Sequence, residues 1–187
     1  MAVLEVGCGR AEVLTGFKSL GLRCHGSDIS EYADECCARE DIPYRRWDLL
    51  SETTPWPESS FDIVYSKSVL EHFHDGLGVI SRQISLLKPG GLLLVLTPDW
   101  ESNIKIFFDD FSHFQPYSTV SLVSLLEVSG LDDVNARRFR QLPITWRFPP
   151  ADLLSRVIAP FVIARSKNKF LRWSRELMIA GSGRRPM

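Results

Sequence analysis

Two glycines separated by one residue, Gly7 and Gly9, follow the short apolar run Val3–Val6 near the start of the chain. A glycine turn between a strand and a helix brings backbone N–H groups close to a nucleotide-like ligand. A dinucleotide-binding turn has a third glycine three residues after the second, and this sequence has Glu12 there. A carboxylate at that place repels a pyrophosphate and favours a cationic ligand. No Gly-Lys-Ser/Thr follows, which excludes a phosphate-binding loop as well.

Three further acidic residues lie where such a ligand would meet them. Glu5 lies in the first predicted strand, where it can order the turn and hydrogen-bond an ammonium group. Asp28 lies 21 residues after Gly7, at the end of the second predicted strand, where a carboxylate accepts hydrogen bonds from both ribose hydroxyls. Asp48, near the end of the third, would meet an adenine amino group. Adenine, ribose and ammonium without phosphate describe S-adenosylmethionine (SAM). A purely structural turn, and a loop-capping role for Asp48, are the alternatives.

The sequence resembles the class I SAM-dependent methyltransferases in five stretches, which occur in the order and at the spacing of that family's motifs: AVLEVGCGRAEVL, GSDIS, WDLL, PWPESSFDIVYSKSVLEHF and LKPGGLLLVLTP. The branch it resembles is the small-molecule type, similar to ubiquinone-biosynthesis-like methyltransferases (methyltransferase type 11). The resemblance is strong over about residues 2–98 and looser over 99–135. It implies SAM as cofactor, S-adenosylhomocysteine as product, and a sheet with strand order 3-2-1-4-5-7-6.

The resemblance also implies which residues surround the cofactor: Glu5, Gly7, Cys8, Gly9, Asp28, Ile29, Asp48, Leu49 and Ser66. The first four would shape the pocket for the methionine part. Asp28 would hold the ribose, Ile29 would pack on the adenine, and Asp48 with Leu49 would meet the adenine edge. Ser66, after the fourth predicted strand, would face the sulfonium end, where the methyl group leaves.

An alcohol acceptor needs a base to take its proton, and three histidines are candidates. They are His72 and His74 in the stretch LEHFHD, and His113 in FFDDFSHFQPY. For His72, a structural or pocket-lining role is the alternative to a catalytic one. His113 follows the fifth predicted strand beside Asp109 and Asp110, and an Asp–His pair would raise the basicity of the imidazole. We predict that His113 is the general base of an O-methylation; a surface loop of mixed charge is the alternative.

Short apolar runs alternate with helical patterns along the chain, which predicts an α/β, doubly wound, mostly parallel Rossmann-like sheet with helices on both faces. The strands are expected at residues 3–6, 22–27, 44–49, 61–66, 92–96, 133–141 and 177–180. Helices are expected near 10–20, 31–40, 76–88 and 117–129, with Ser30 as an N-cap and a turn at 88–91. The loops after the first four strands would share one rim, where ligands bind in such sheets.

We expect a SAM-binding core at residues 1–142, a helical lid or insertion at 143–176 that could be interfacial, and a last strand with a tail at 177–187. Charge divides the chain differently: residues 1–135 carry a net charge of −11 and residues 136–187 a net charge of +10. Mutually attracting faces of one fold would produce this division. The same division is expected if the basic part binds an anionic substrate, nucleic acid or, through residues 143–176, a membrane surface. Nucleic acid is disfavoured because no RNA-binding module is visible.

The remaining expectations concern the cysteines, the cellular location and the start of the chain. The four cysteines lack metal-ligand spacing, which predicts reduced thiols, no metal site and a cytoplasmic location. Members of the family that this chain resembles have one or two helices before the first strand, and here Met1 lies two residues from it. Either the start is truncated, or residues 143–176 or a second subunit of a homodimer close the site.

The predicted function is transfer of a methyl group from SAM to a small-molecule acceptor, by O-methylation of a lipid-like, sugar or natural-product substrate. Two alternatives remain open. One is an RNA or protein methyltransferase that uses the basic C-terminal region, and the other is a non-catalytic subunit that binds SAM or binds nothing. The acceptor itself cannot be read from the sequence.

Overall fold

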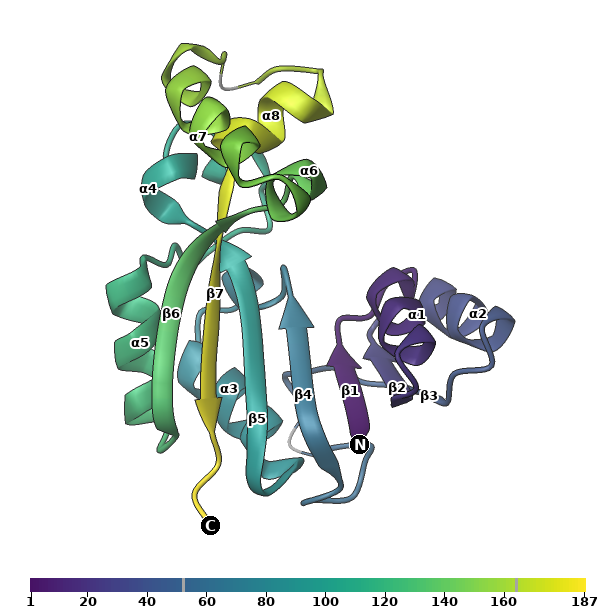
Figure 1. Ribbon diagram of the computed structural model, residues 1–187. Coiled ribbons are helices and arrows are strands. Elements are labelled where there is room, and N and C mark those ends of the chain that lie inside the picture. The colour runs from purple at the N-terminus through teal and green to yellow at the C-terminus, as the bar shows by residue number, and fades with distance from the viewer. Residues whose placement is uncertain (52, 164) are drawn as a thin grey trace.

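A computed structural model describes residues 1–51, 53–163 and 165–187, and in them seven strands form one sheet (Figure 1). The strands are β1 (Ala2–Val6), β2 (Arg23–Asp28), β3 (Tyr44–Arg46), β4 (Phe61–Lys67), β5 (Leu87–Pro98), β6 (Asp132–Arg140) and β7 (Leu177–Arg184). Their order is β3-β2-β1-β4-β5-β7-β6, with β7 antiparallel to both of its neighbours. The predicted α/β fold and strand order are confirmed.

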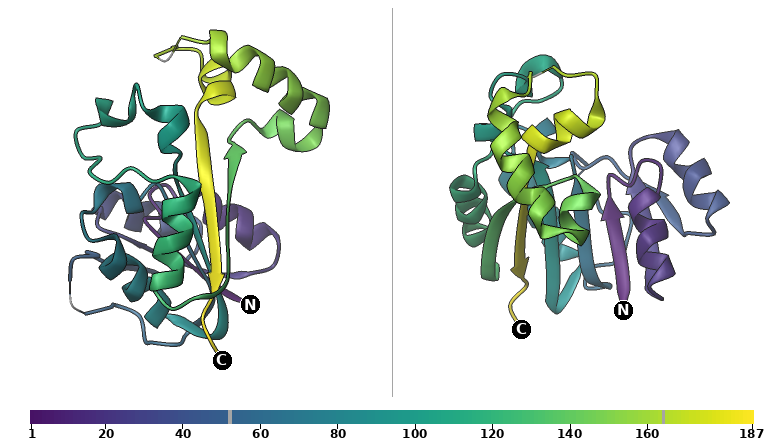
Figure 2. Two further views of the ribbon diagram at one scale, coloured as in Figure 1. Left: turned by 90° about the vertical axis from the view of Figure 1, so that its left-hand side faces the viewer. Right: turned by 45° about the horizontal axis from the view of Figure 1, so that its top comes forward.

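Helices cover both faces of the sheet, as the alternating pattern predicts. The longer ones are α1 (Glu12–Ser19), α2 (Glu31–Arg39), α3 (Gly76–Ser85) and α5 (Thr119–Val128). Two separate clusters of buried side chains lie beneath them: one under α1 and α2, the other under α3 and α5. In the left view of Figure 2, α1 and α5 lie on opposite sides of the strands. The predicted N-cap of α2 is present, since the Ser30 hydroxyl accepts a hydrogen bond from the backbone N–H of Tyr32.

Strands β3, β5 and β7 differ in length from the prediction, and β5 starts at Leu87 instead of residue 92. Strand β3 ends at Arg46, three residues early, because the chain from Trp47 onwards turns along the rim of the sheet. Strand β7 continues to Arg184, past the predicted end at Ala180. Glycine suggested a break there, but Gly181 and Gly183 let β7 pass close to its neighbours. A Cβ on Gly181 would lie 2.7 Å from a Leu122 methyl, and one on Gly183 would lie 2.9 Å from Leu131.

The predicted turn at 88–91 lies within β5 as an irregularity of the strand pairing. Phe61 of β4 pairs with Leu87, and Ile63 pairs with Leu92, so the intervening residues of β5 have no counterpart. Gly90 adopts a left-handed φ of +73° in this segment. The glycines thus mark a bulge, and not the start of the strand.

Residues 143–176, called the cap below, lie between β6 and β7 and contain α6 (Pro143–Arg147), α7 (Pro149–Ile158), the 3-10 turn η3 (Ala159–Phe161) and α8 (Lys169–Arg175). Figure 1 shows the cap beyond the carboxyl ends of β4 and β5. Next to it, after β5, lie the short helix α4 (Trp100–Asn103) and the turn η2 (Phe107–Asp109). No helix among the described residues is long and apolar enough to cross a membrane.

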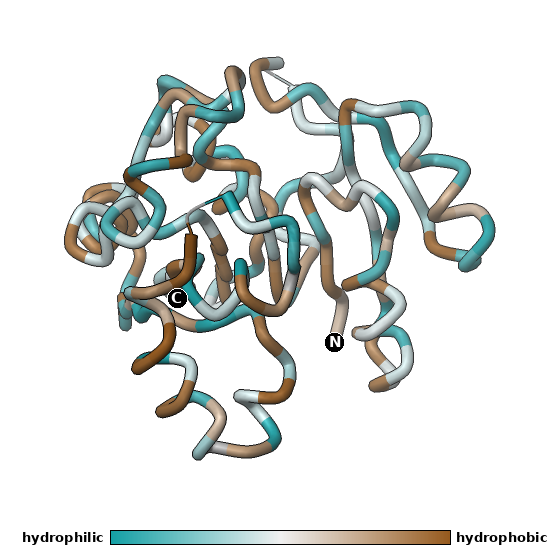
Figure 3. Tube along the Cα trace, turned by 90° about the horizontal axis from the view of Figure 1, so that it is seen from above, coloured by the Kyte–Doolittle hydropathy of each residue, from teal (hydrophilic) through white to brown (hydrophobic). Residues whose placement is uncertain are grey.

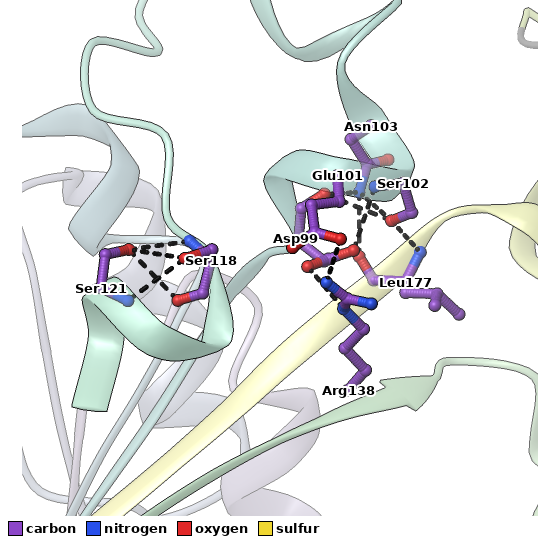
Figure 4. Close-up of polar contacts among 8 residues, drawn as sticks. All are labelled: Asp99, Glu101, Ser102, Asn103, Ser118, Ser121, Arg138 and Leu177. Atoms are coloured by element: carbon purple, nitrogen blue, oxygen red, sulfur yellow. Dashed lines mark hydrogen bonds and ion pairs between the residues drawn. The ribbon is translucent and has the colours of Figure 1, made fainter.

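A buried carboxylate joins α4 to β6 at the end of the sheet from which the cap extends (Figure 4). Asp99 is fully buried at the start of α4, where it accepts hydrogen bonds from the N–H of Ser102 and, at 3.0 Å, from Nε of Arg138 on β6. Asn103 donates to the carbonyl of Leu177 at 2.9 Å, where β7 begins. These bonds connect β5, β6 and β7 at the end of the sheet from which the cap extends.

Candidate functional site

The turn after β1 has the geometry that its glycines predict. Gly7 has a φ of +76°, and a Cβ there would lie 2.3 Å from a methyl group of Val69. The N–H groups of Gly7 and Cys8 both donate to the carbonyl of Ser27, at 2.7 and 3.1 Å. Only glycine fits this position without displacing Val69. The left-handed φ disfavours any other residue, and Val69 occupies the space that a side chain would need.

Asp28 joins this turn to the start of α2. One carboxylate oxygen accepts the N–H of Gly9 at 2.9 Å, and the other accepts the N–H of Ser30 at 2.8 Å. Each oxygen has a second lone pair, so the group can still accept hydrogen bonds from a diol. The carboxylate is therefore held in place by the backbone before any ligand contacts it.

A cavity of about 420 Å³ opens over this turn at the carboxyl ends of the strands. Its lining residues are Val6, Gly7, Asp28, Ile29, Trp47, Asp48, Leu49, Leu50, Ser68, Val69, His72 and Phe73. The structure thus brings Gly7, Asp28, Ile29, Asp48 and Leu49 together around one space. Ile29 and Leu50 are 57% and 65% exposed, so an adenine ring entering the cavity would cover apolar surface that faces solvent.

The other predicted cofactor residues lie behind this lining. Gly9 contributes its N–H to Asp28. Cys8 turns its thiol away from the cavity into the cluster beneath α1 and α2, 3.8 Å from the Cys37 sulfur, and burial raises its pKa. Ser66 is buried beside Val6, and its hydroxyl has no hydrogen-bond partner among the described residues.

Glu5 is a buried carboxylic acid in β1, next to Val6 of the cavity lining. It is only 3% exposed, and its Oε2 finds no hydrogen-bond partner within the described part of the chain. Burial raises the pKa of Glu5 to about 8, against the lowering effect of the Lys67 charge. A buried acid with an unused oxygen can bind a cation, because an ammonium group would restore the charge-assisted hydrogen bond that burial removes.

The predicted site residues did not include six residues of the cavity lining: Val6, Trp47, Leu50, Ser68, Val69 and Phe73. Trp47 and Leu50 belong to the WDLL motif, of which only Asp48 and Leu49 were predicted to meet the cofactor. Ser68 has a left-handed φ of +53°, which no feature of the sequence indicates. It turns the chain after β4 so that the next residue, Val69, meets Gly7.

His72 and His113 contact each other, with ring centroids 4.8 Å apart. Nδ1 of His72 lies 3.1 Å from the carbonyl oxygen of Ser112 and 3.0 Å from its hydroxyl. That hydroxyl donates its proton to Asp110 at 2.6 Å, so Nδ1 of His72 is the donor toward Ser112. His72 therefore presents Nε2 as the acceptor nitrogen.

His113 is oriented in the same way by the backbone. Its Nδ1 lies 2.7 Å from the carbonyl oxygen of Phe107, which can only accept, so Nδ1 carries the proton and Nε2 is the basic nitrogen. Nε2 lies 3.9 Å from a carboxylate oxygen of Asp110. The neighbouring Asp109, also a predicted partner, binds Arg165 of the cap at 2.7 and 2.8 Å instead.

A second cavity, of about 790 Å³, lies between the loop after β5 and the cap. Its lining residues are Ile106, Asp109, Asp110, Phe111, His113, Arg165, Ser166, Lys167, Arg172 and Glu176. His72 lines the first cavity and His113 lines the second. The contact between the two rings is therefore where the two cavities approach each other.

Glu71, His72 and His113 bring one possible metal ligand each within 4.8 Å of one another, which the sequence, read as lacking a metal site, did not indicate. Two ligands of one zinc ion lie at most about 4.3 Å apart, so this spacing is wider than zinc requires. Glu71 is fully buried, and its Oε2 accepts a hydrogen bond from Thr97. We interpret the group as three neighbouring side chains that are held separately, by Thr97, Ser112 and the carbonyl of Phe107.

Comparison with known proteins identifies the family. The sequence profile of a family described as a methyltransferase domain matches residues 1–136. The chain belongs to the class I SAM-dependent methyltransferases. The fold agrees, since a SAM-dependent methyltransferase from Archaeoglobus fulgidus matches with a TM-score of 0.70 and 22% identity over 98% of this chain and 86% of its own.

Two curated relatives show how far the likeness in sequence extends. A probable SAM-dependent methyltransferase of Mycolicibacterium smegmatis is 30% identical over 137 residues, which are 70% of this methyltransferase and 51% of the relative. A ubiquinone biosynthesis O-methyltransferase of Ruegeria pomeroyi is 25% identical over 173 residues, 81% of this chain and 68% of that protein. This chain thus spans about half the length of the first relative and two thirds of the second.

SAM, the cofactor of this family, is compatible with the site. A solved phosphoethanolamine N-methyltransferase of Haemonchus contortus, in complex with SAM, matches all of this chain and 49% of its own length, with a TM-score of 0.68 and 18% identity. In the present chain the unpartnered oxygen of buried Glu5 matches an ammonium group, and the backbone-held Asp28 matches a ribose. The turn has no side chain at Gly7, because Val69 occupies the space that a Cβ would need.

Proposed function

We propose that this protein transfers a methyl group from SAM to a hydroxyl of a small-molecule acceptor. One observation carries the proposal: the contact between His72, which lines the cavity over the glycine turn, and His113, which lines the cavity beneath the cap. A methyl donor bound in the first cavity and an acceptor bound in the second would approach each other beside this pair. Two adjoining cavities with a base between them suit an in-line transfer, which depends on alignment.

The chain's own residues would hold the cofactor. Glu5 would bind its ammonium group, Asp28 its ribose, and Asp48 with Leu49 the adenine edge. Asp48 is itself oriented, since one of its carboxylate oxygens accepts the N–H of Leu50 at 2.9 Å. When bound, SAM supplies an electrophilic methyl group on a sulfonium.

His113 would act as the general base. Its Nδ1 proton is committed to the Phe107 carbonyl, so Nε2 can accept the proton of an acceptor hydroxyl as the oxygen becomes a nucleophile. The new bond joins that oxygen to the methyl carbon, and the bond between methyl and sulfur breaks. Asp110, at 3.9 Å, would stabilise the imidazolium that forms. The cap would exclude water from the second cavity.

The relatives support this choice of acceptor atom in part. One of them is named as an O-methyltransferase of ubiquinone biosynthesis, and a solved structure of the same fold is named as an N-methyltransferase. An unprotonated amine needs no base, whereas a hydroxyl does. The oriented imidazole of His113 therefore favours oxygen over nitrogen.

Calorimetric titration with S-adenosylhomocysteine tests the first half of the proposal. The wild type should bind, and Asp28→Ala should bind at least about tenfold more weakly, because two hydrogen bonds to ribose are lost. Asp34→Ala, an exposed aspartate on α2, is the matched control and should bind as the wild type does. A folded protein that binds nothing would instead support a non-catalytic subunit.

Labelled SAM tests the second half. Incubation with fractionated extracts should transfer label to a low-molecular-weight product that is stable to base, as an ether is. Label recovered in RNA or protein would support the alternative in which the basic C-terminal region recruits a macromolecule.

A further inference from the structure

Helix α7 of the cap has its apolar face outward. Leu153, Leu154 and Val157 lie on one side of the helix and are 66%, 61% and 60% exposed. Ser155 on the opposite side is buried, and Asp152 turns toward the sheet, where it accepts a hydrogen bond from Nε of Arg140 at 2.9 Å. In a helix that only covers its own core, the apolar side chains face inward.

The exposed apolar surface continues along the chain on both sides of α7. Trp146 and Phe148 before it are 62% and 58% exposed, and Phe161 and Ile163 after it are 85% and 79% exposed. In the view from above, apolar segments run through outlying parts of the chain as well as through the strands (Figure 3). Single exposed apolar residues are ordinary, but a run of them over 18 residues of sequence marks an interaction surface.

The cap is also positively charged. Residues 143–176 contain seven basic and two acidic residues, a net charge of +5, while the rest of the chain has a net charge of −6. Arg156 and Arg165 of the same segment pair with Asp152 and Asp109, and their side chains remain 69% and 66% exposed. An anionic surface would attract the cap and repel the body of the molecule, and this would orient the protein with its cap toward that surface.

We propose that the cap is a docking surface for an anionic lipid bilayer, with α7 lying in the plane of the headgroups and its leucines and valine inserted below them. Short amphipathic helices with apolar and basic side chains bind in this way without crossing the membrane. The long arginine side chains can reach headgroup phosphates while their stems cover apolar surface.

A second copy of the chain fits the cap less well. Contact between two caps would bring together two surfaces of like charge, which Coulomb repulsion opposes. Contact between a cap and the acidic body of another copy would satisfy the charges, but it would leave the apolar face of α7 against a charged surface. The bilayer alone satisfies both the apolar and the basic side chains.

Docking would place the cavity beside His113 near the headgroups, because Arg165, Ser166 and Lys167 of the cap line that cavity. An amphipathic acceptor could then enter from the membrane. This consequence rests on the proposed methyl transfer, whereas the docking itself does not.

Sedimentation with lipid vesicles tests the docking. The purified chain should sediment with vesicles of equal parts phosphatidylcholine and phosphatidylglycerol. Binding should be much weaker to phosphatidylcholine alone and should fall as salt is raised. The variant with Leu153→Ser, Leu154→Ser and Val157→Ser should bind at least about tenfold more weakly, because the inserted apolar surface is lost. Binding of S-adenosylhomocysteine by the same variant should be unchanged, which shows that it is folded and separates this result from the proposed function.

The matched control carries Leu20→Ser, Leu77→Ser and Val120→Ser, which remove an exposed leucine just after α1, one on α3 and an exposed valine on α5. It should bind vesicles as the wild type does. Three results would overturn the proposal: no binding to anionic vesicles, equal loss in both triple variants, or a dimer in analytical ultracentrifugation that the α7 substitutions dissociate.

Discussion

The rim over the glycine turn and the cap lie at the same end of the sheet, yet they are organised in opposite ways. At the rim, backbone groups hold the polar side chains, since Gly9 and Ser30 hold Asp28, and the exposed apolar side chains of Ile29 and Leu50 line the cavity. In the cap, side-chain ion pairs such as Asp152 with Arg140 lie inward and apolar residues lie outward. The apolar surface of the first region lines a cavity for a small ligand, whereas that of the second faces outward and would be covered only by a larger surface.

The largest expected effect comes from the base that joins the two regions. His113→Ala should lower kcat by about 100- to 10,000-fold, because the acceptor hydroxyl loses its proton acceptor. Affinity for S-adenosylhomocysteine should stay within about twofold of the wild type, since His113 lines only the second cavity. His74→Ala, which removes an exposed histidine packed on Phe114, is the control and should keep its activity. Full turnover by the His113 variant would remove it from the role of base.

At the rim, Gly7→Ala should destabilise the protein by about 2–4 kcal/mol. The added Cβ requires a left-handed backbone for alanine and overlaps Val69. Gly21→Ala is a matched control, with a φ of +79° and no atom within 4 Å of the added Cβ, and should cost only about 1 kcal/mol. Denaturant unfolding measures both. Equal costs would show that the contact with Val69 does not constrain the turn.

Glu5 gives the rim a pH dependence. Its folded pKa of about 8 lies above the ordinary value of 4.5, so the folded protein retains a proton that the unfolded chain releases between these values. The stability that Glu5 contributes is therefore complete below pH 4.5 and is lost as the pH rises toward 8. Between pH 5 and 8 the wild type should lose about 3–4 kcal/mol more than Glu5→Gln does. Parallel pH profiles of the two proteins would show that Glu5 titrates normally.

At the base of the cap, Asp99→Ala should cost about 2 kcal/mol. It leaves the N–H of Ser102 without its acceptor and Arg138 with only Glu101, at 2.6 Å, as its acidic partner. Limited proteolysis should then cut the cap faster, while S-adenosylhomocysteine still binds. Asp132→Ala, at an exposed position on β6, is the control. Cutting at the wild-type rate would mean that the cap is held by other contacts.

The smallest effect separates the two regions most directly. Leu154→Ala should change the free energy of unfolding by less than about 0.5 kcal/mol, because the side chain is 61% exposed. Leu14→Ala, on the fully buried face of α1, should cost about 2–5 kcal/mol. If the two substitutions cost the same, the cap would be packed as a core, and its apolar face would need no external partner.

The sequence by itself determined the features that depend on neighbouring residues. Local backbone preferences and short spacing predict the glycine turn, the N-cap of α2 at Ser30 and the alternation of strands and helices. They also predict the carboxylates at the end of β2 and beyond β3. The family motifs extended this local information to the strand order. Whether the predicted residues bind SAM is what the calorimetric titration decides.

Only the tertiary structure decided the features that join distant parts of the chain. His72 and His113 are 41 residues apart in sequence, and their contact depends on how the loop after β5 returns to β4. The early end of β3 and the late end of β7 depend on packing against the rim and against α5. The orientation of α7 could not be predicted, because its amphipathic pattern shows that one face is apolar but not which face meets the protein. That choice depends on Arg140, which draws Asp152 inward.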